Sequence, residues 1–169
     1  EGGPHTTPDW HADSDQAGAQ FGASVGTAGD VNCDGYSDVI VGAPMWDNGQ
    51  DNEGGAWVYF GSPLGLSDAL GWRQDSDQGG ANYGLAVGTA GDVNGDGCSD
   101  IIVGAPLWNG GLDTEGKAFV YHSSGASLYL TPAWTKESDQ AAAHFGCSVG
   151  TAGDVNGDGY ADVIVGAKW

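Results

Sequence analysis

The sequence has very few basic residues: four lysines and arginines stand against 23 aspartates and glutamates in 169 residues, a formal net charge of -19. Phosphate groups are bound by clustered lysine and arginine, so this composition argues against nucleic acid and acidic membrane surfaces as partners. Long apolar runs are also missing, since no stretch approaches the roughly 20 residues that span a bilayer. No signal peptide is visible at Glu1. We therefore expect neither nucleic-acid binding nor membrane insertion.

Cysteine is scarce as well. Cys33, Cys98 and Cys147 are an odd number, and they occupy different places in the repeat described below. They align with Gly95, Tyr36 and Ala23 in other copies of the repeat, so the cysteines look like individual substitutions. We expect no disulfide framework and no zinc cluster.

Glycine, in contrast, is abundant, with 32 residues, and 40% of the chain is apolar. The length suits one domain, and this apolar content is enough for a buried core. The glycines follow no triplet period and alternate with ordered runs of valine, isoleucine and tryptophan, which indicates many tight turns rather than collagen or disorder. The composition predicts an all-β protein.

A nine-residue motif occurs three times, at Asp30–Asp38, Asp92–Asp100 and Asp154–Asp162. Oxygen-bearing side chains stand at positions 1, 3, 5 and 9, and glycine at position 6 permits a sharp turn. The main-chain carbonyl of position 7 can add a ligand, and Ca²⁺ takes six to eight oxygens at flexible geometry. The motif predicts about three Ca²⁺ per chain. The predicted ligands are Asp30, Asn32, Asp34, Tyr36, Asp38, Asp92, Asn94, Asp96, Cys98, Asp100, Asp154, Asn156, Asp158, Tyr160 and Asp162, with Tyr36, Cys98 and Tyr160 acting through their backbone carbonyls.

Two alternatives compete with this interpretation. A single segment of this kind is equally compatible with an Asp/Asn/Gly hairpin turn, but three copies with every oxygen position retained favour calcium. An EF-hand loop shares most positions but needs a bidentate Glu at position 12, where this chain has Val41, Val103 and Val165. The β-branched run after each motif predicts a short strand, not the helix of an EF-hand or a dockerin-like repeat.

The first aspartates of the motif recur every 62 residues, and so do Trp10, Trp72 and Trp134. A unit of this length with four strand-like runs favours a β-propeller blade over a helical solenoid. In the first full repeat we expect strands at 24–31, 38–43 and 55–61 and a fourth centred on Trp72. We expect Trp72, Tyr83 and Val58 to pack between blades. The predicted fold is all-β, with propeller blades of four antiparallel strands and about three blades per chain.

Further short motifs accompany the calcium motif throughout the chain. They are Phe21-Gly22, Gly29 to Asn32, Val41 to Pro44 and Gly55 to Gly61, followed by Tyr83-Gly84, Gly104 to Pro106, Phe145-Gly146 and Gly166-Ala167. Together they resemble the FG-GAP repeat of integrin alpha-chain β-propellers and of bacterial FG-GAP surface proteins. The resemblance implies blades of four antiparallel strands with calcium in a hairpin loop at one rim. The last repeat departs from the pattern, because Lys168 stands where Pro44 and Pro106 stand.

We expect one array of repeats, divided into blade units. Residues 1–16 are expected to form the fourth strand of a preceding blade, 17–78 and 79–140 two complete blades, and 141–169 a partial blade. Propellers close with four to eight blades, and bare blade faces are apolar. We therefore expect the chain either to belong to a longer array or to self-associate to complete a ring, and we favour an oligomer.

The chain is not expected to be an enzyme. Catalytic groups in a repeat protein usually break the repeat, but the side chains that do so show no catalytic arrangement. They are His5, His11, His122, His144, Arg73 and Lys117. No nucleophile elbow, metalloprotease helix or phosphate loop is present. The carboxylates could pair for glycoside hydrolysis, but nine of them already belong to the calcium motifs.

These observations predict an integrin-like module for adhesion or ligand binding, with structural Ca²⁺. Loops of modest affinity would be filled outside cells or in a periplasm, so we expect an extracellular, cell-surface or periplasmic location. One alternative is a carbohydrate-binding propeller, and another is a purely structural repeat of a large surface protein. The candidate sugar-binding residues are Trp46, Asn48, Asp51, Trp108, Asn109 and Asp113.

Overall fold

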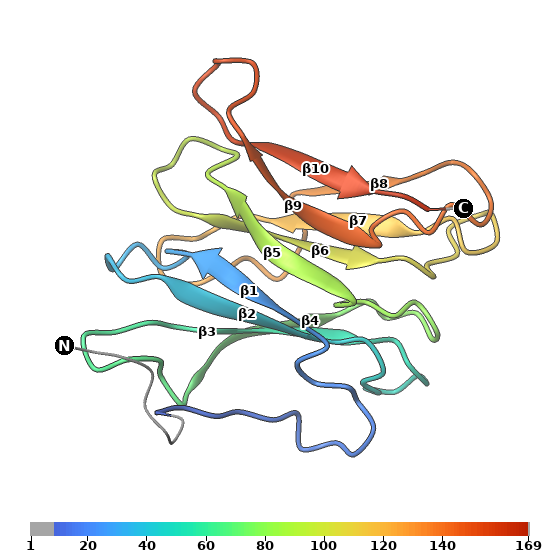
Figure 1. The fold of residues 1–169 in the computed structure, drawn as a ribbon, viewed down its shortest axis with the longest axis horizontal. Helices are drawn as coiled ribbons and strands as arrows, with labels where there is room; N and C mark the ends of the chain where they lie inside the picture. The colour runs from blue at the N-terminus through green and yellow to red at the C-terminus, as the bar shows by residue number, and fades with distance from the viewer. Residues whose placement is uncertain (1–8, 169) are drawn as a thin grey trace.

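Figure 1 shows the computed structural model, which describes residues 9–168. His5, Glu1 and Trp169 lie outside the described residues. Over the described residues every regular element is a β-strand, so no helix there could span a membrane. The strands are β1 (Ser24–Gly29), β2 (Asp38–Ala43), β3 (Gly55–Tyr59), β4 (Leu70–Asp75), β5 (Ala86–Gly91), β6 (Asp100–Ala105), β7 (Lys117–Tyr121), β8 (Trp134–Glu137), β9 (Ser148–Gly153) and β10 (Asp162–Gly166).

The strands form three antiparallel sheets in sequence order: β1 to β4 (blade 1), β5 to β8 (blade 2), and β9 with β10 (hairpin 3). Sequential antiparallel pairing follows from the short connections between consecutive strands. The register is repeated, since Gly42 pairs with Ala56 in blade 1 and Gly104 with Ala118 in blade 2. The first strands of the sheets lie side by side, with β1 against β5 and β5 against β9 (Figure 1). The prediction of an all-β propeller fold with four-stranded blades is confirmed.

The strand predictions for blade 1 are close to the observed elements. The second strand has the expected bounds, the first and third end two residues earlier than expected, and Trp72 lies within β4. β6 is buried at every position because both of its faces are covered by neighbouring sheets. Its continuous apolar sequence, Ile101-Ile102-Val103, suits a strand that is buried on both faces.

The largest core lies between blade 1 and blade 2. Val58 and Trp72 on blade 1 pack against Tyr83, Ile101 and Tyr121 on blade 2. The Trp72 ring meets the Tyr121 ring edge-on, with centroids 5.0 Å apart, and the indole N–H donates to the Tyr129 carbonyl. The prediction that Trp72, Tyr83 and Val58 pack between blades is confirmed, since all three are at most 4% exposed.

The FG and GAP glycines form the contact between successive sheets. The Gly84 amide donates to the Gly104 carbonyl of its own repeat, 3.0 Å away. Gly84 also lies against Gly42 of the preceding blade, where a Cβ on Gly42 would collide with the Gly84 carbonyl. Gly84 has a φ of 83°, which L-residues with a side chain adopt at a cost. Glycine is therefore needed at these positions for the blades to approach each other.

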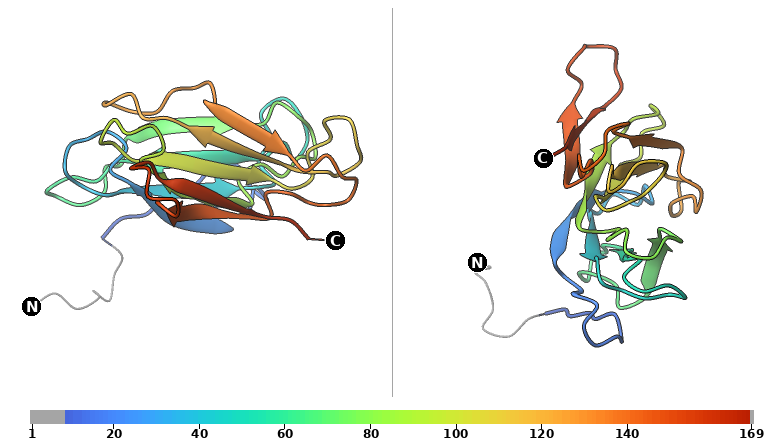
Figure 2. Two further views of the ribbon diagram at one scale, coloured as in Figure 1. Left: turned by 90° about the horizontal axis from the view of Figure 1, so that it is seen from above. Right: turned by 90° about the vertical axis from the view of Figure 1, so that its right-hand side faces the viewer.

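The two ends of the stack are covered differently. At the blade 1 end, Trp10 and Phe21 pack on Trp57 and Tyr59, with Trp10 edge-on to Tyr59 at 4.9 Å. Trp10 lies in irregular structure and not in the expected strand. Its indole N–H nevertheless donates to the Ser67 carbonyl, just as the indole N–H of Trp72 donates to the Tyr129 carbonyl. At the other end, hairpin 3 and its loop project from the stack (Figure 2).

The last repeat leaves its second strand in the same way as the others, despite the lysine. In blades 1 and 2 the residue after the proline, Met45 or Leu107, donates its amide to an upstream alanine carbonyl. In the last repeat Lys168 itself makes this bond, to Ala143 at 2.8 Å. Proline has no amide hydrogen, so the bond falls one residue later where proline is present.

Candidate metal sites

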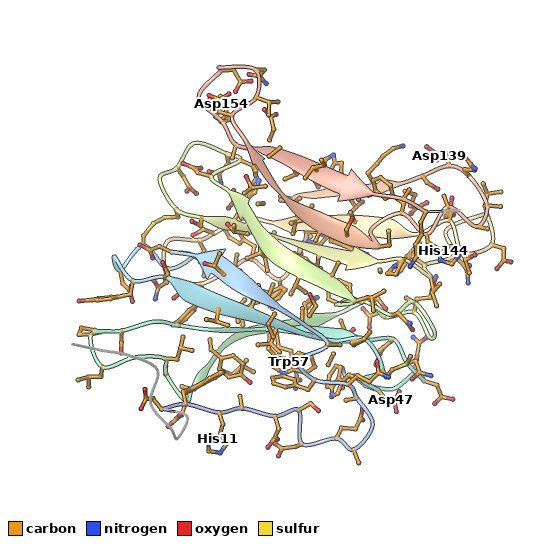
Figure 3. All side chains as sticks on the ribbon, in the orientation of Figure 1. His11, Asp47, Trp57, Asp139, His144 and Asp154 are labelled. Carbon is orange, nitrogen blue, oxygen red and sulfur yellow. A yellow bond between two sulfur atoms is a disulfide. The ribbon has the colours of Figure 1, made fainter. Side chains whose placement is uncertain are left out.

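The three nine-residue motifs form the loops between the first two strands of each sheet, and all three lie at one end of the strands. We call them loop 1 (30–38), loop 2 (92–100) and loop 3 (154–162). Asp154 labels loop 3 in Figure 3. In each loop, glycine at position 6 has a φ of about 90°, for example 90° at Gly35 and 93° at Gly159. This left-handed turn lets the chain fold back over its own acidic side chains.

The side chains at positions 1, 3 and 5 turn inward over the loop amides. In loop 1, Asp30 accepts hydrogen bonds from the amides of Asp34 (3.1 Å) and Gly35 (2.9 Å). Asn32 also accepts from the Asp34 amide, and Asp34 accepts from the Tyr36 amide. Loops 2 and 3 repeat this pattern from Asp92 and Asp154. The sequence therefore gathers the first three predicted side-chain ligands at one place in every loop.

The position-9 aspartates fasten the loops to the sheets. Asp100 accepts from the Val93 amide at 3.0 Å and from the Ser123 amide, beyond β7, at 2.8 Å. Asp38 makes the equivalent bonds to Val31 and Gly61, both 2.8 Å. Asp162 bonds the Val155 amide at 2.9 Å. In residues 9–168 the three aspartates of a loop do not bring their oxygens within 4.8 Å of one another, because position 9 is turned to the backbone.

The donor set fits calcium better than a softer metal. Every side-chain ligand predicted for the loops offers oxygen, and hard cations such as Ca²⁺ prefer oxygen ligands. A carboxylate has about four lone-pair sites, so hydrogen bonds from the loop amides leave further sites for a cation. The backbone carbonyls of Tyr36, Cys98 and Tyr160 belong to the same loops. The assignment of these residues as ligands remains a prediction.

The electrostatic environments of the aspartates differ between positions. Burial raises the pKa of Asp38 and of Asp100 above the usual range, although the backbone amides that bond them act in the opposite direction. The pKa of Asp154, which is exposed, is lowered chiefly by the hydrogen bond from the Gly159 amide. Amide donors therefore favour a charged carboxylate at position 1 of loop 3.

Neighbouring loops contact each other directly. The Ser99 amide of loop 2 donates to the Asp30 carbonyl of loop 1 at 2.9 Å, and Ala161 of loop 3 donates to Asp92 of loop 2 at 2.8 Å. Position 4 of one loop also faces position 7 of the next. Between loops 2 and 3 this pair is Gly95 and the ring of Tyr160.

Between loops 1 and 2 the same pair is Cys33 and Cys98, which form a disulfide with a Cα separation of 5.4 Å. The expectation of no disulfide was wrong for these two residues, while Cys147 is a free thiol. The cysteines stand at different places of the 62-residue repeat because the disulfide joins two different positions of neighbouring copies. Pairing position 4 of one loop with position 7 of the next would have revealed it.

A second acidic cluster lies at the other end of blade 1, and the sequence analysis did not identify it. Glu53, just before β3, lies beside Asp75 and Asp77, at and just beyond the end of β4. One carboxylate oxygen of each is within 4.8 Å of the others. Glu53 is fully buried, and burial raises the pKa of its carboxyl, with a smaller contribution from the negative charge of Asp75. A sequence signal was available, since in both blades an acid precedes the third strand, a second acid ends the fourth strand and a third acid follows it.

The other candidate residues do not form a site. His11, in the segment before β1, and His144, in the connection before β9, lie far apart in Figure 3. Trp46 was expected on an exposed sugar-binding loop, but it is only 6% exposed. Its ring packs edge-on to Trp57 and lies under the Arg73 guanidinium, 4.9 Å away. The guanidinium thus covers this ring, and little of Trp46 is open to solvent.

Comparison with known proteins identifies related sequences over most of the chain. The FG-GAP repeat profile matches residues 21–59, 83–121 and 145–169. Human integrin alpha-7 is 36% identical over 157 residues, or 87% of this chain. Integrin alpha-V from Gallus gallus is 37% identical and integrin alpha-3 from Cricetulus griseus 34% identical, each over 90% of this chain. The chain spans only 12%, 15% and 14% of these three relatives, respectively.

Proposed function

The chain belongs to the FG-GAP repeat family of integrin-like β-propeller proteins, and on this premise we propose that it is a calcium-stabilised module that binds a protein ligand in adhesion. The observation that carries the proposal is the threefold loop, in which aspartate and asparagine oxygens gather around a glycine turn at one end of each sheet. The loops hold the first two strands of a sheet together and touch the next loop. Calcium bound there would therefore stabilise both a blade and its contact with its neighbour.

The proposed role of calcium is structural. With a dissociation constant of roughly 0.1 mM and millimolar free Ca²⁺, each site adds about 1.4 kcal/mol to the free energy of unfolding. Three sites add about 4 kcal/mol, a large share of the stability of a typical domain. Bound calcium would also reduce the formal charge of -19 to about -13, since three ions carry about six positive charges.

We place the module outside the cytosol, on a cell surface, in the extracellular space or in a periplasm. Loops of this affinity class are filled where calcium is millimolar. The disulfide between Cys33 and Cys98 supports the same location, because disulfides persist in oxidising compartments. The proposed role is non-catalytic binding, and the covered ring of Trp46 gives no support to sugar stacking.

Association with a further propeller segment is part of the proposal. At the hairpin 3 end, Ile164 is 63% exposed and Trp134 is 41% exposed, whereas the equivalent residues between blades 1 and 2 are buried. Exposed apolar surface of this kind marks an interaction face. We propose that copies self-associate through it, or that further blades of a longer array cover it. A monomer mass by light scattering at tens of micromolar would contradict self-association.

Thermal unfolding by circular dichroism, in excess EDTA and in millimolar Ca²⁺, tests the role of the loops. We expect Ca²⁺ to raise the midpoint by about 10 °C and Mg²⁺ to raise it much less. Replacing the exposed position-5 aspartates, Asp34, Asp96 and Asp158, by alanine removes most of this rise. Asp113→Ala, in an exposed position outside the loops, is the matched control and keeps it. An equal midpoint in EDTA and Ca²⁺ would leave the loops as acidic turns.

Attachment of beads coated with the chain to immobilised extracellular proteins tests the binding role. We expect attachment in Ca²⁺ and its loss in EDTA and in the triple loop variant. Binding of the same beads to a glycan array tests the alternative of carbohydrate recognition. Attachment to glycans alone would contradict the proposal in favour of carbohydrate recognition.

A further inference from the structure

We propose that Glu53, Asp75 and Asp77 form a second type of divalent-cation site, at the end of blade 1 opposite to the calcium loops. The three carboxylates come from two connections that meet there, the one before β3 and the one after β4. Asp75 pairs with Gly55 at the end of the β3–β4 ladder, whereas the calcium loops lie at the far end of β2. The proposal does not rest on the loops, because the two groups share no residue.

The buried glutamate carries the argument. Glu53 is 0% exposed, and its Oε1 accepts a hydrogen bond from the Asn48 amide. Its Oε2 is buried and has no hydrogen-bond partner among residues 9–168. A buried carboxylate oxygen without a partner is costly, and a bound cation is one of the ways in which proteins satisfy it. Asp75 and Asp77 place two further carboxylates beside it, within 4.8 Å.

Blade 2 shows how the same acids are neutralised without a metal. Its equivalents of the cluster are Glu115, Glu137 and Asp139. Lys117 pairs with Glu137 at 2.9 Å, and Lys136 pairs with Asp139 at 2.6 Å. The carboxylates of Glu137 and Asp139 are therefore each paired with a lysine of the same blade.

Glu115 in blade 2 is satisfied in a different way, by the backbone. Its Oε1 accepts three amide hydrogen bonds, from Gly110, Gly111 and Leu112. The Glu53 loop in blade 1 has a different sequence, Asn48-Gly49-Gln50, at these places. In this loop Glu53 accepts a hydrogen bond from the Asn48 amide, with a smaller backbone contribution from Gln50.

Blade 1 lacks both lysines. Gly55 stands at the position of Lys117, and Gln74 at the position of Lys136. The Gln74 amide group turns away to the Leu130 carbonyl, and the Arg73 guanidinium lies over the Trp46 ring. Three clustered carboxylates to which the described part of the chain brings no ammonium group leave a concentrated negative charge. A divalent cation supplies the positive charge that two lysines supply in blade 2.

The chemistry of the ligands indicates the kind of cation. All are carboxylates, which suit hard cations, and Asp77 is exposed, so bound water can complete the shell. Asp77 has a φ of 54°, and Asp75 accepts the Asp77 amide, so the turn holds both carboxylates at one place. The expected ion is Ca²⁺, and Mn²⁺ is a suitable paramagnetic substitute.

The test counts bound Ca²⁺ per chain by equilibrium dialysis and compares variants in pairs. Asp77→Asn keeps the positive φ and the exposed surface, so its fold is preserved, and we expect it to bind one ion fewer than the wild-type chain. Asp139→Asn, the matched change in blade 2, is expected to bind the wild-type number. Gln74→Lys, which introduces the blade 2 lysine, is expected to weaken binding at this site at least about tenfold.

A difference of one ion is expected whether or not the loops bind calcium, so this result is independent of the proposed function. Paramagnetic Mn²⁺ locates the bound ion. In the wild-type chain it should broaden the amide NMR signals of Gly54 and Gln78, which lie near the cluster, and in Asp77→Asn these signals should stay sharp. Equal ion counts and equal affinities in the wild-type chain, Asp77→Asn and Gln74→Lys would overturn the proposal. So would Mn²⁺ broadening confined to loops 1 to 3.

Discussion

Blade 2 and hairpin 3 begin with nearly the same sequence but lie in different surroundings. Residues 87–94 and 149–156 are identical, as Val-Gly-Thr-Ala-Gly-Asp-Val-Asn. Ile102 is 0% exposed while its equivalent, Ile164, is 63% exposed. Both segments nevertheless form the same hairpin and the same loop hydrogen bonds. The local sequence thus determines the hairpin and the loop, and the neighbouring sheet determines burial.

The aspartates at position 9 show the same difference. Asp100 is buried and bonds both the loop and the residue after β7, whereas Asp162 is half-buried and bonds the loop. Burial raises the pKa of Asp100. In the absence of metal, the free-energy cost of keeping the Asp100 carboxylate charged therefore depends on how far the surrounding strands bury it.

The largest difference between the two regions is expected for the isoleucines. Ile102→Ala should lower the free energy of unfolding by about 4 kcal/mol, because it leaves a cavity in a core closed on both faces. Ile164→Ala should lower it by less than about 0.5 kcal/mol, since the side chain is already exposed. Urea unfolding of the two variants in EDTA measures both values. Equal losses would mean that hairpin 3 is covered in solution by another copy.

The disulfide distinguishes the contact between loops 1 and 2 from the contact between loops 2 and 3. Replacing both Cys33 and Cys98 by serine should cost about 3 kcal/mol, because the bond closes a long loop of the unfolded chain. Cys147→Ser, at the free cysteine, is the control and should cost less than about 0.5 kcal/mol. The comparison uses urea unfolding without reductant. A double variant as stable as the control would show that backbone bonds alone hold loops 1 and 2 together.

The position-9 aspartates should differ by a smaller amount. Asp100→Ala removes the acceptor of two backbone amides and should cost about 2 kcal/mol in EDTA. Asp162→Ala removes one exposed bond and should cost about 0.5 kcal/mol. Urea unfolding in EDTA separates this effect from metal binding. A larger loss for Asp162→Ala would contradict the assignment of burial as the cause.

The smallest effect is expected at a buried tyrosine pair of the blade 1 and blade 2 contact. The Tyr83 hydroxyl bonds the Tyr121 hydroxyl at 2.9 Å, and burial raises the pKa of both above the usual value. Such groups contribute stability that is fully present below pH about 10 and is lost as pH rises through the folded-state pKa. Tyr83→Phe should cost about 1 kcal/mol at pH 7 and make the loss of stability above pH 10 shallower.

Phe21 and Phe145 stand at the position of Tyr83 in the other repeats, so Tyr83→Phe introduces a residue that the same backbone already carries. Unfolding in urea at several pH values from 7 to 11 gives the dependence. An unchanged slope above pH 10 would show that this pair does not control the alkaline transition.

Much of the fold could be predicted because the same sequence pattern occurs three times in the chain. The period of 62 residues, the β-branched runs and the turn glycines were enough for the blades and for the bounds of β2. The gathering of Asp30, Asn32 and Asp34 around Gly35 also followed from the local motif. These features depend on residues close to one another in the chain.

The features that were missed join residues far apart in sequence. The disulfide links residues 65 positions apart, and the cluster of Glu53 with Asp75 and Asp77 spans two connections. The covered ring of Trp46 also depends on contacts with β3 and β4. None of these follows from periodicity, which shows that copies are alike but not which positions of neighbouring copies meet.

The sequence by itself determined the all-β class, the strands, the turn glycines and the acidic loops, because hydrogen bonding and side-chain alternation within one repeat are local. Only the tertiary structure decided which copies of a residue are buried, which cysteines meet and where carboxylates gather without a lysine. The physical reason is that burial and charge compensation are properties of the contact between sheets. Identical residues such as Asp100 and Asp162 therefore acquire different energies from their neighbours.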